Sequence, residues 1–250
     1  MTDQDFYRYQ NRWSKIYFRN ISQSDLDKVL WLNQISGMSS KRILEIGAGG
    51  GQFAVVACQH GHQVTAIEIE PEFVEHIQKL SQSGGCKNLR IMNTDFYSVA
   101  LEDVFDLICY WDGFGIGSDA DQRRLLERMT GWLAPGGSVF LEIFTPWYWA
   151  NLAEGVQIDI GDATRQYGFD AEESVTTDTW WLKDNPVVKK TQRLRCYSPA
   201  DLTLLLDGSG LTMLEIFAGG KVDYQTGTYT PQVSLSQAMA YIARLVHSET

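Results

Sequence analysis

The stretch Ile43-Leu44-Glu45-Ile46-Gly47-Ala48-Gly49-Gly50-Gly51-Gln52-Phe53 decides the fold class of this chain. Its first residues are mostly apolar, as in a buried strand, and a glycine-rich loop follows directly. Glycine has no Cβ, so such a loop can adopt positive φ angles and lets the backbone approach a ligand closely. The stretch therefore predicts a strand, a ligand-binding glycine loop and the start of a helix.

Short β-rich segments alternate with helical patterns around this loop, from residue 41 to residue 144. Phe73, Ile77 and Leu80 mark one amphipathic helix, and residues 125–133 carry a second one, which the turn at residues 134–137 ends. This alternation predicts an α/β doubly wound fold, a parallel sheet with helices on both faces. The expected strands are Arg42–Ile46, Gln63–Glu68, Leu89–Asn93, Phe105–Trp111 and Ser138–Phe144.

Further elements are expected on either side of this core. Two helices precede it, at about residues 5–18 and 24–35. Residues 145–167 are aromatic and irregular, and a hairpin follows them. The expected elements of the last third are hairpin strands at Ser174–Leu182 and Val187–Tyr197, a helix capped by Ser198, a strand at Leu211–Ala218 and an apolar segment at Ala238–Val246.

Composition limits the classes of partner. The chain has 21 Lys and Arg against 31 Asp and Glu, a net charge of −10, so we expect no nucleic-acid partner, which would require a basic surface. The cysteines form no C-x-x-C pair, which predicts free thiols in a reducing compartment. Residues 1–5 are acidic and no apolar run reaches membrane-span length, so we expect a cytoplasmic protein with no signal peptide and no membrane contact.

Carboxylates end two of the expected strands. Glu68 lies 21 residues after Gly47, where it can accept hydrogen bonds from both hydroxyls of a ribose. Asp95 follows the next strand, where it can accept from an adenine amino group while Phe96 packs on the ring. A dinucleotide site would need its third glycine at position 52, which is Gln52. S-adenosylmethionine has no pyrophosphate to place at a helix N-terminus, so the glycine spacing favours this methyl donor.

With these motifs the chain resembles the class I S-adenosylmethionine-dependent methyltransferases. The resemblance covers about residues 41–144 and rests on Glu45-x-Gly47-x-Gly49-x-Gly51, Glu68, Asp95-Phe96 and Leu133-Ala134-Pro135-Gly136-Gly137, four motifs in the family's order. It implies a Rossmann-like sheet of seven strands whose last strand is antiparallel. It also implies S-adenosylmethionine as cofactor and S-adenosylhomocysteine as product.

The resemblance further implies how the cofactor is held. The three glycines of the motif would contact the methionine part, with Glu45 near its amino group. Glu68 would hold the ribose, and Asp95 with Phe96 the adenine. The remaining residues assigned to the cofactor pocket are Tyr17, Ile69 and Trp111.

The acceptor is expected beyond the fourth strand, around Asp112-Gly113-Phe114, because ligands of doubly wound folds bind at the carboxyl ends of strands. Asp112 is the candidate catalytic residue, able to take an amine proton or hold a cation, and a turn-stabilising role is its alternative. The segment departs from the (Asp/Asn)-Pro-Pro-aromatic motif of nucleic-acid amino methyltransferases. One carboxylate does not make a set of oxygen ligands, so no metal is expected. None of the four histidines is placed as a general base, which favours an amine or carboxylate acceptor.

Aromatic residues are concentrated in residues 145–197 and in the first helix, which suggests an acceptor cap and a lid, with core packing as the alternative. Arg193 and Arg195 alternate on one strand face and could pair with a substrate carboxylate. Trp13 and Tyr17, four residues apart, could form the lid. The residues assigned to the substrate are Trp13, Phe114, Trp147, Tyr148, Trp180, Arg193 and Arg195.

The expected organisation is one methyltransferase domain over residues 1–250. It comprises N-terminal lid helices (1–40), a cofactor-binding core (41–145), an inserted acceptor cap (146–198) and the C-terminal part of the sheet (199–250). The expected function is methylation of a small molecule, on nitrogen slightly more than on oxygen, in specialised metabolism. The alternatives are a catalytically silent S-adenosylmethionine-binding module, a protein or RNA methyltransferase, and a nicotinamide oxidoreductase.

Overall fold

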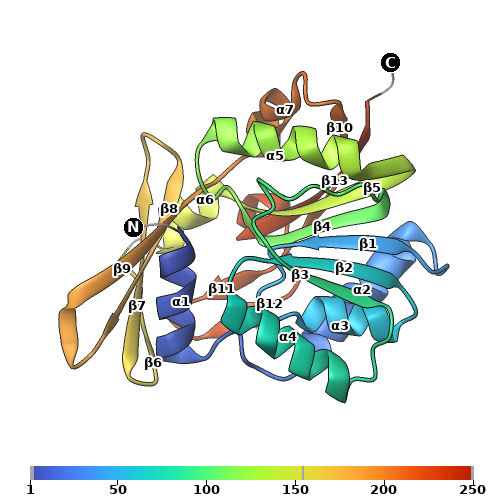
Figure 1. Ribbon diagram of the computed structural model, residues 1–250. Coiled ribbons are helices and arrows are strands. Elements are labelled where there is room, and N and C mark those ends of the chain that lie inside the picture. The colour runs from blue at the N-terminus through green and yellow to red at the C-terminus, as the bar shows by residue number, and fades with distance from the viewer. Residues whose placement is uncertain (1–2, 154, 249–250) are drawn as a thin grey trace.

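A seven-stranded sheet forms the centre of the computed structural model, which describes residues 3–153 and 155–248 (Figure 1). The strand order is β10-β13-β5-β4-β1-β2-β3. The five strands from β5 to β3 pair in parallel, whereas β13 runs antiparallel to both β5 and β10. The strands are β1 (Arg42–Ile46), β2 (Gln63–Glu68), β3 (Leu89–Asn93), β4 (Phe105–Phe114), β5 (Leu133–Phe144), β10 (Leu211–Ala218) and β13 (Ala240–His247). The predicted doubly wound sheet with an antiparallel last strand is confirmed.

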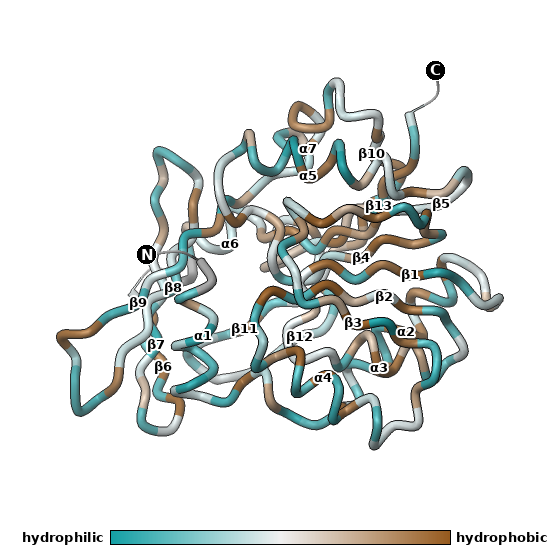
Figure 2. The backbone as a smooth tube through the Cα atoms, in the orientation of Figure 1, coloured by the Kyte–Doolittle hydropathy of each residue, from teal (hydrophilic) through white to brown (hydrophobic). Residues whose placement is uncertain are grey.

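Helices cover both faces of this sheet (Figure 1). One face packs on α2 (Gln23–Ser36), α3 (Gln52–Gln59) and α4 (Pro71–Ser83), and the other on α5 (Asp119–Trp132) and α7 (Pro199–Leu206). The central strands are hydrophobic along most of their length, as Figure 2 shows for β1, β4 and β5. Because both faces are covered, these strands carry apolar side chains on both sides.

A second, antiparallel sheet lies between β5 and α7 in sequence and has the order β6-β7-β8-β9. We call it the cap sheet. Its strands are β6 (Gln157–Ile160), β7 (Ala163–Asp170), β8 (Val175–Leu182) and β9 (Asn185–Arg195). The expected hairpin is present as β8 and β9. The expected irregular structure before it is wrong in part, because β7 has no regular alternation of polar and apolar residues and its pairing with β6 and β8 makes it a strand.

Helix α1 (Asp3–Ser14) packs on the cap sheet through Phe6, which is buried with Ala163 and Trp180 (Figure 1). The two expected N-terminal helices are therefore present, although the first ends at Ser14 rather than at residue 18. The smaller elements are α6 (Pro146–Tyr148), a π-helical turn (Trp149–Ala153), β11 (Lys221–Asp223), β12 (Thr228–Thr230) and a 3-10 turn (Leu235–Gln237).

Two strand boundaries of the central sheet differ from the expected ones, and the hairpin strands β8 and β9 are shifted by one or two residues. β5 begins at Leu133, not Ser138, because Leu133 already pairs with Phe105 across a register shift. β4 continues to Phe114, and its pairing with β5 is irregular between Tyr110 and Phe114. The second irregularity matters for function because it contains Asp112.

The division of the chain into one domain with lid, core and cap stays a prediction. Residues 1 and 2 of the expected acidic N-terminus lie outside the described residues. Within residues 3–153 and 155–248, no helix is long and apolar enough to cross a membrane.

Candidate functional site

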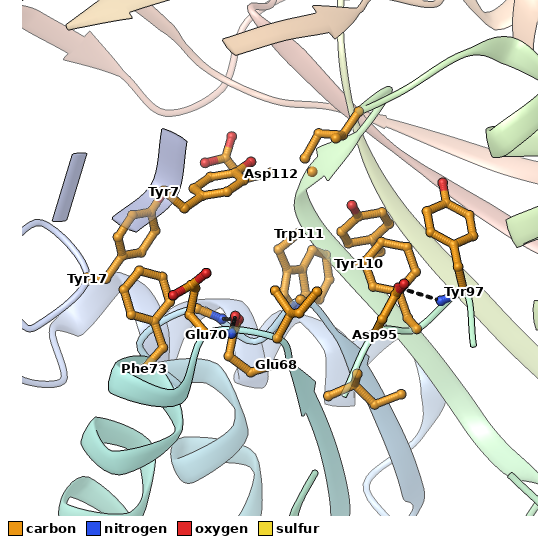
Figure 3. Close-up of a pocket in the computed structure, with 17 residues that line it drawn as sticks. Tyr7, Tyr17, Glu68, Glu70, Phe73, Asp95, Tyr97, Tyr110, Trp111 and Asp112 are labelled. Atoms are coloured by element: carbon orange, nitrogen blue, oxygen red, sulfur yellow. Dashed lines mark hydrogen bonds between the residues drawn. The ribbon is translucent and has the colours of Figure 1, made fainter. Parts of the chain in front are cut away.

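A cavity of about 320 Å³ opens at the carboxyl ends of β1, β2 and β4 (Figure 3). Figure 3 shows Tyr17 and Phe73 on one side of it and Tyr110, Asp95 and Tyr97 on the other, with Glu68 between them. Its volume lies in the range of small-molecule sites, roughly 300–1,000 Å³. We call it the cofactor cavity. The residues that line it are Tyr7, Tyr17, Gly47, Gly49, Ile67, Glu68, Ile69, Glu70, Phe73, Asp95, Phe96, Tyr97, Tyr110, Trp111, Asp112, Gly113 and Ile116.

The glycine loop forms one wall of the cofactor cavity. Gly47 and Gly49 have φ angles of +63° and +54°, and a Cβ at Gly49 would lie 3.3 Å from the Tyr17 ring. Gly51, also expected to contact the cofactor, does not line the cavity. Instead, a Cβ at Gly51 would lie 2.5 Å from Cγ1 of Ile77, so this glycine allows α3 to pack on α4.

Glu68 lines the cavity and also holds the backbone around it. Its Oε2 accepts from the amide of Gly49 at 2.7 Å, and its Oε1 accepts from the amide of Glu70 at 2.9 Å. Burial raises the pKa of Glu68 to about 7, and the two amide donors only partly oppose this. Each carboxylate oxygen has a second lone pair, so Glu68 can still accept hydrogen bonds from a ligand.

The opposite end of the cavity is formed by the end of β3 and the loop after β2. Asp95 and Phe96 both line it, with Ile69 nearby. Oδ1 of Asp95 accepts from the amide of Tyr97 at 2.8 Å, and Phe96 packs against Tyr110 with ring centroids 5.7 Å apart. This end therefore offers a carboxylate beside an aromatic face.

Glu45 lies behind the glycine loop and does not line the cavity. It is 3% exposed, and its Oε2 has no hydrogen-bond partner among the residues that the structure describes. Burial raises the pKa of Glu45 to about 8, against the opposing charge of Lys28. The Lys28 ammonium lies 4.5 Å from the ring of Trp111, which does line the cavity.

Asp112 lies where the cofactor cavity meets a second, smaller space. Its backbone is left-handed, with a φ of +56°, in the irregular part of β4. The side chain is exposed and lines both spaces, and no described residue forms a hydrogen bond with its carboxylate. The surrounding protein raises the pKa of Asp112 to about 7 by desolvation, with a further contribution from Glu142. Strained, non-glycine backbone of this kind is concentrated at functional sites.

The second space, which we call the chamber, has a volume of about 40 Å³ between the core, α1 and the cap sheet. It shares Tyr7, Tyr17 and Asp112 with the cofactor cavity. Its other lining residues are Gln10, Phe144, Trp149, Arg165, Tyr167, Thr176, Asp178, Gln192 and Leu194.

The substrate-binding residues expected from the sequence line neither space. Trp147 and Tyr148 donate to the carbonyls of Leu235 and Val222. Phe114 is buried between Tyr110 and Tyr197, Trp180 is buried under α1, and Trp13 packs on Tyr9. These five aromatic side chains are used in packing or in hydrogen bonds to the backbone, and their assignment to the substrate stays a prediction that the geometry does not support.

The two arginines assigned to a substrate carboxylate also lie outside both spaces, and their assignment stays a prediction. Arg193 points to solvent and forms ion pairs with Asp170 and Glu173. Arg195 pairs with Asp119 at 3.5 Å and stacks on Tyr197. Both lie on β9, whereas the arginine that faces the chamber is Arg165 on β7.

Sequence reasoning missed the chamber residues Tyr7, Gln10, Arg165, Asp178 and Gln192. No local motif marks them, because they meet only when α1 packs on the cap sheet. Charge does not single them out either, because residues 145–197 hold many charged residues besides Arg165 and Asp178.

The remaining polar candidates agree with a site built of carboxylates. None of the four histidines lines the cofactor cavity or the chamber. In the described part of the chain, no group of three or more His, Cys, Asp or Glu is arranged to hold a metal ion. All four cysteines have free thiols.

Residues 43–137 match the model of a protein family described as a methyltransferase domain. This match places a methyltransferase domain in residues 43–137. The fold of the chain agrees with a solved S-adenosylmethionine-dependent methyltransferase from Clostridium acetobutylicum, with a TM-score of 0.73 and 14% identity over 97% of this chain and 98% of that one. At this identity the likeness establishes the fold alone.

Curated relatives of this methyltransferase domain differ in their acceptors. The tRNA 5-carboxymethoxyuridine methyltransferase of Escherichia coli (strain K12) is 28% identical over 48% of this chain and 45% of its own length. The phosphoethanolamine N-methyltransferase 1 of Arabidopsis thaliana is 32% identical over 47% of this chain and 25% of its own length. The chain spans less than half the length of these relatives. The comparisons therefore establish the domain and its fold, and they do not support the expected exclusion of nucleic acid.

Proposed function

We propose that this protein is an S-adenosylmethionine-dependent methyltransferase whose acceptor is a small molecule, with an amine nitrogen favoured over oxygen. The observation that carries the proposal is the position of Asp112 at the junction between the cofactor cavity and a separate polar chamber, where its carboxylate forms no hydrogen bond with a described residue. A donor site on one side and an acceptor site on the other is the arrangement that methyl transfer requires.

The residues present fit S-adenosylmethionine. Bare glycine backbone at Gly47 and Gly49 leaves room beside Tyr110 and Tyr17. Glu68 has free lone pairs for ribose hydroxyls, and Asp95 beside Phe96 suits an adenine. When bound, this cofactor supplies an electrophilic methyl group on a positively charged sulfur, and the buried carboxylates around the cavity favour such a cation.

Asp112 would position and deprotonate the acceptor amine. An amine must lose its proton before its lone pair can react, and a carboxylate with a pKa of about 7 can hold that proton. No hydrogen bond to described residues competes for its oxygens. The aromatic faces of Tyr7, Tyr17 and Trp149 around the same space would stabilise a cationic amine by about 0.5–2 kcal/mol each.

The narrow chamber supports a small acceptor over a nucleic acid. It is enclosed by α1 and the cap sheet, and the chain has a net charge of −10. A phosphate backbone would meet this acidic surface without the cations that usually bind it. The cytoplasmic location, the absence of a metal and a place in specialised metabolism stay predictions.

The test has a binding arm and a turnover arm. Calorimetry should show that S-adenosylmethionine and S-adenosylhomocysteine bind and that NADH does not. Mass spectrometry of small amines, carboxylates, phenols and unmodified tRNA, each incubated with labelled S-adenosylmethionine, should show methyl transfer to an amine. NADH binding without binding of either sulfur nucleoside would overturn the cofactor assignment. Labelling of tRNA alone would overturn the acceptor class, and binding without any transfer would favour a silent binding module.

A further inference from the structure

The chamber beside Asp112 is small enough to limit what can enter it. Its volume of about 40 Å³ compares with the roughly 10–15 Å³ that one water molecule needs by the same kind of measure. About three water-sized groups therefore fit beyond Asp112, which is the size of one short polar end group.

Arg165 is the cation that faces this space. Its Nε and Nη2 donate to the two carboxylate oxygens of Asp178, each at 2.8 Å. Its guanidinium also lies 4.3 Å from the ring centroid of Tyr167 and 5.3 Å from that of Trp180. Salt bridge and stacking together fix the plane and orientation of the guanidinium.

The guanidinium has donors to spare. It carries five N–H groups, and the two bonds to Asp178 account for all of its hydrogen bonds to described residues. The side chain keeps 22% of its surface exposed although it lies inside the molecule, and it lines the chamber. The free edge of Arg165 can therefore donate to an oxygen acceptor placed in the chamber.

An enclosed ion pair of this kind calls for a functional explanation. Removing two charges from water costs about as much as their attraction returns, so such a pair is a weak source of stability. Asp178 also accepts from the side chain of Gln10 on α1, at 3.5 Å. The pair thus holds one positively charged edge in a fixed position at the end of the chamber, tied to both the cap sheet and α1.

The opposite charge faces the same space. Asp112 also lines the chamber, and the charge of Arg165 lowers the pKa of Asp112 against the stronger effect of desolvation. One wall of the chamber therefore offers a carboxylate, and another offers guanidinium N–H groups.

We propose that this chamber binds the acid group of the acceptor, so that the substrate is a small amino acid whose amine faces Asp112 and whose carboxylate meets Arg165. The inference rests on the proposed function and adds the chemical class of the acceptor. A carboxylate has three heavy atoms, which matches the volume, and it can accept two parallel N–H bonds from one edge of an arginine. A phosphate is bulkier and carries up to two charges, and Asp178 next to Arg165 disfavours it.

The first experiment measures binding to the protein saturated with S-adenosylhomocysteine. Calorimetry with glycine, a panel of other amino acids, ethylamine and propionate separates the two charged ends of the acceptor. We expect at least one small amino acid to bind at least about tenfold more tightly than either ethylamine or propionate, because only the amino acid uses both ends. Equal affinity for ethylamine, or no binding of any amino acid, overturns the proposal.

The second experiment tests Arg165 itself. The double variant Arg165→Gln/Asp178→Asn removes both charges and leaves no unpaired buried ion, and Arg165→Lys keeps the charge but loses the forked geometry. Both should weaken the binding of the amino acid by about tenfold or more and leave S-adenosylhomocysteine affinity within a few-fold. Arg193→Gln is the matched control, on the same sheet but facing solvent, and should change neither affinity.

The outcomes separate this inference from the function on which it rests. If S-adenosylhomocysteine does not bind the wild-type protein, the proposed function fails and the inference with it. If S-adenosylhomocysteine binds and both Arg165 variants keep full affinity for the amino acid, only the inference fails. Thermal unfolding identifies a misfolded variant, and Arg165→Lys then decides the question if the double variant does not fold.

Discussion

The cofactor cavity and the chamber meet at Asp112 but are built in different ways. The cofactor cavity takes most of its walls from a single stretch of chain, in which each strand from β1 to β4 ends in, or leads directly into, residues that line the cavity. The chamber takes its walls from α1, β4 and the cap sheet, and its hydrogen bonds join residues as far apart as Gln10 and Asp178 or Tyr7 and Gln192. A site whose residues are close together in the sequence can be predicted from motifs. A site whose residues are far apart in the sequence depends on how the elements pack.

Charge separates the two regions as well. Among the described residues, Glu68 and Glu45 have no cation within hydrogen-bonding distance, and burial raises the pKa values of both, whereas Glu70, which also lines the cavity, pairs with Arg8. In the chamber Asp178 is already paired with Arg165. Burial lowers the pKa of Arg165, but Asp178, Tyr167 and Asp112 together raise it further, so the arginine keeps its charge. The first region is prepared for a cationic ligand, and the second for a ligand that carries both signs.

The largest effect should follow a change at the junction. We expect Asp112→Asn to lower turnover by about 10²–10⁴-fold, as loss of a general base does, while S-adenosylhomocysteine affinity stays within a few-fold. Asparagine tolerates a left-handed backbone, so the fold should persist. Asp112→Gly relieves the strain at a φ of +56° and should be at least as stable as the wild type but equally inactive. Steady-state kinetics and thermal unfolding test both variants, and turnover within tenfold of the wild type would make Asp112 a turn residue only.

Glu68→Ala should weaken ligand binding in the cofactor cavity rather than in the chamber. We expect S-adenosylhomocysteine affinity to fall by about 100-fold, which one or two charge-assisted hydrogen bonds can account for. The variant also leaves the buried amides of Gly49 and Glu70 without an acceptor, so the free energy of unfolding should fall by about 1–3 kcal/mol. Calorimetry and denaturant titration measure the two effects. Glu68→Gln keeps an acceptor oxygen and should recover part of the affinity and part of the free energy of unfolding. An unchanged dissociation constant in Glu68→Ala would show that this residue only supports the loop.

The raised pKa values predict that the affinities for cationic S-adenosylmethionine and neutral S-adenosylhomocysteine depend differently on pH. With pKa values of about 7 for Glu68 and about 8 for Glu45, both groups lose their protons as pH rises from 6 to 8. The affinity for cationic S-adenosylmethionine should therefore rise by about tenfold over this range, and that for neutral S-adenosylhomocysteine by less. Calorimetry at several pH values tests this, and parallel profiles for the two nucleosides would contradict it.

The same groups fix the sign of the stability change with pH. Their folded-state pKa values lie above the ordinary value of 4.5, so the folded protein binds more protons than the unfolded chain between about pH 4.5 and pH 8. Their contribution to the free energy of unfolding is complete below this window and falls as pH rises through it. Denaturant titrations of the wild type and of Glu68→Gln should show a shallower fall in the variant.

The smallest effect is expected on the outer face of the cap sheet. Arg193 is half exposed and pairs with Asp170 and Glu173 in water. Surface ion pairs contribute about 0–1 kcal/mol, so Arg193→Gln should leave turnover unchanged and alter the free energy of unfolding by no more than this. A loss of turnover above tenfold would indicate that Arg193 on β9 binds the substrate carboxylate, and would contradict the proposal that the carboxylate binds in the chamber.

The sequence by itself determined the core of this protein and most of its cofactor cavity. The glycine loop and the carboxylates at positions 68 and 95 follow directly after strands, and parallel strands bring their carboxyl ends to one edge of the sheet. Position along the chain therefore sufficed to place Gly47, Glu68 and Asp95 together. Gly51 differs, because it does not line the cavity and its missing Cβ allows a helix contact that no local pattern reveals.

Only the tertiary structure decided the acceptor side. The aromatic residues of the cap were expected to line a pocket, but packing buries Trp180 and Tyr148 and partly buries Trp147 instead. Whether Arg165 or Arg193 faces the substrate depends on which face of the cap sheet packs toward the core, and the sequence pattern of β7 and β9 does not specify it. Strand alternation defines two faces, and only contacts between segments more than 150 residues apart choose the inner one.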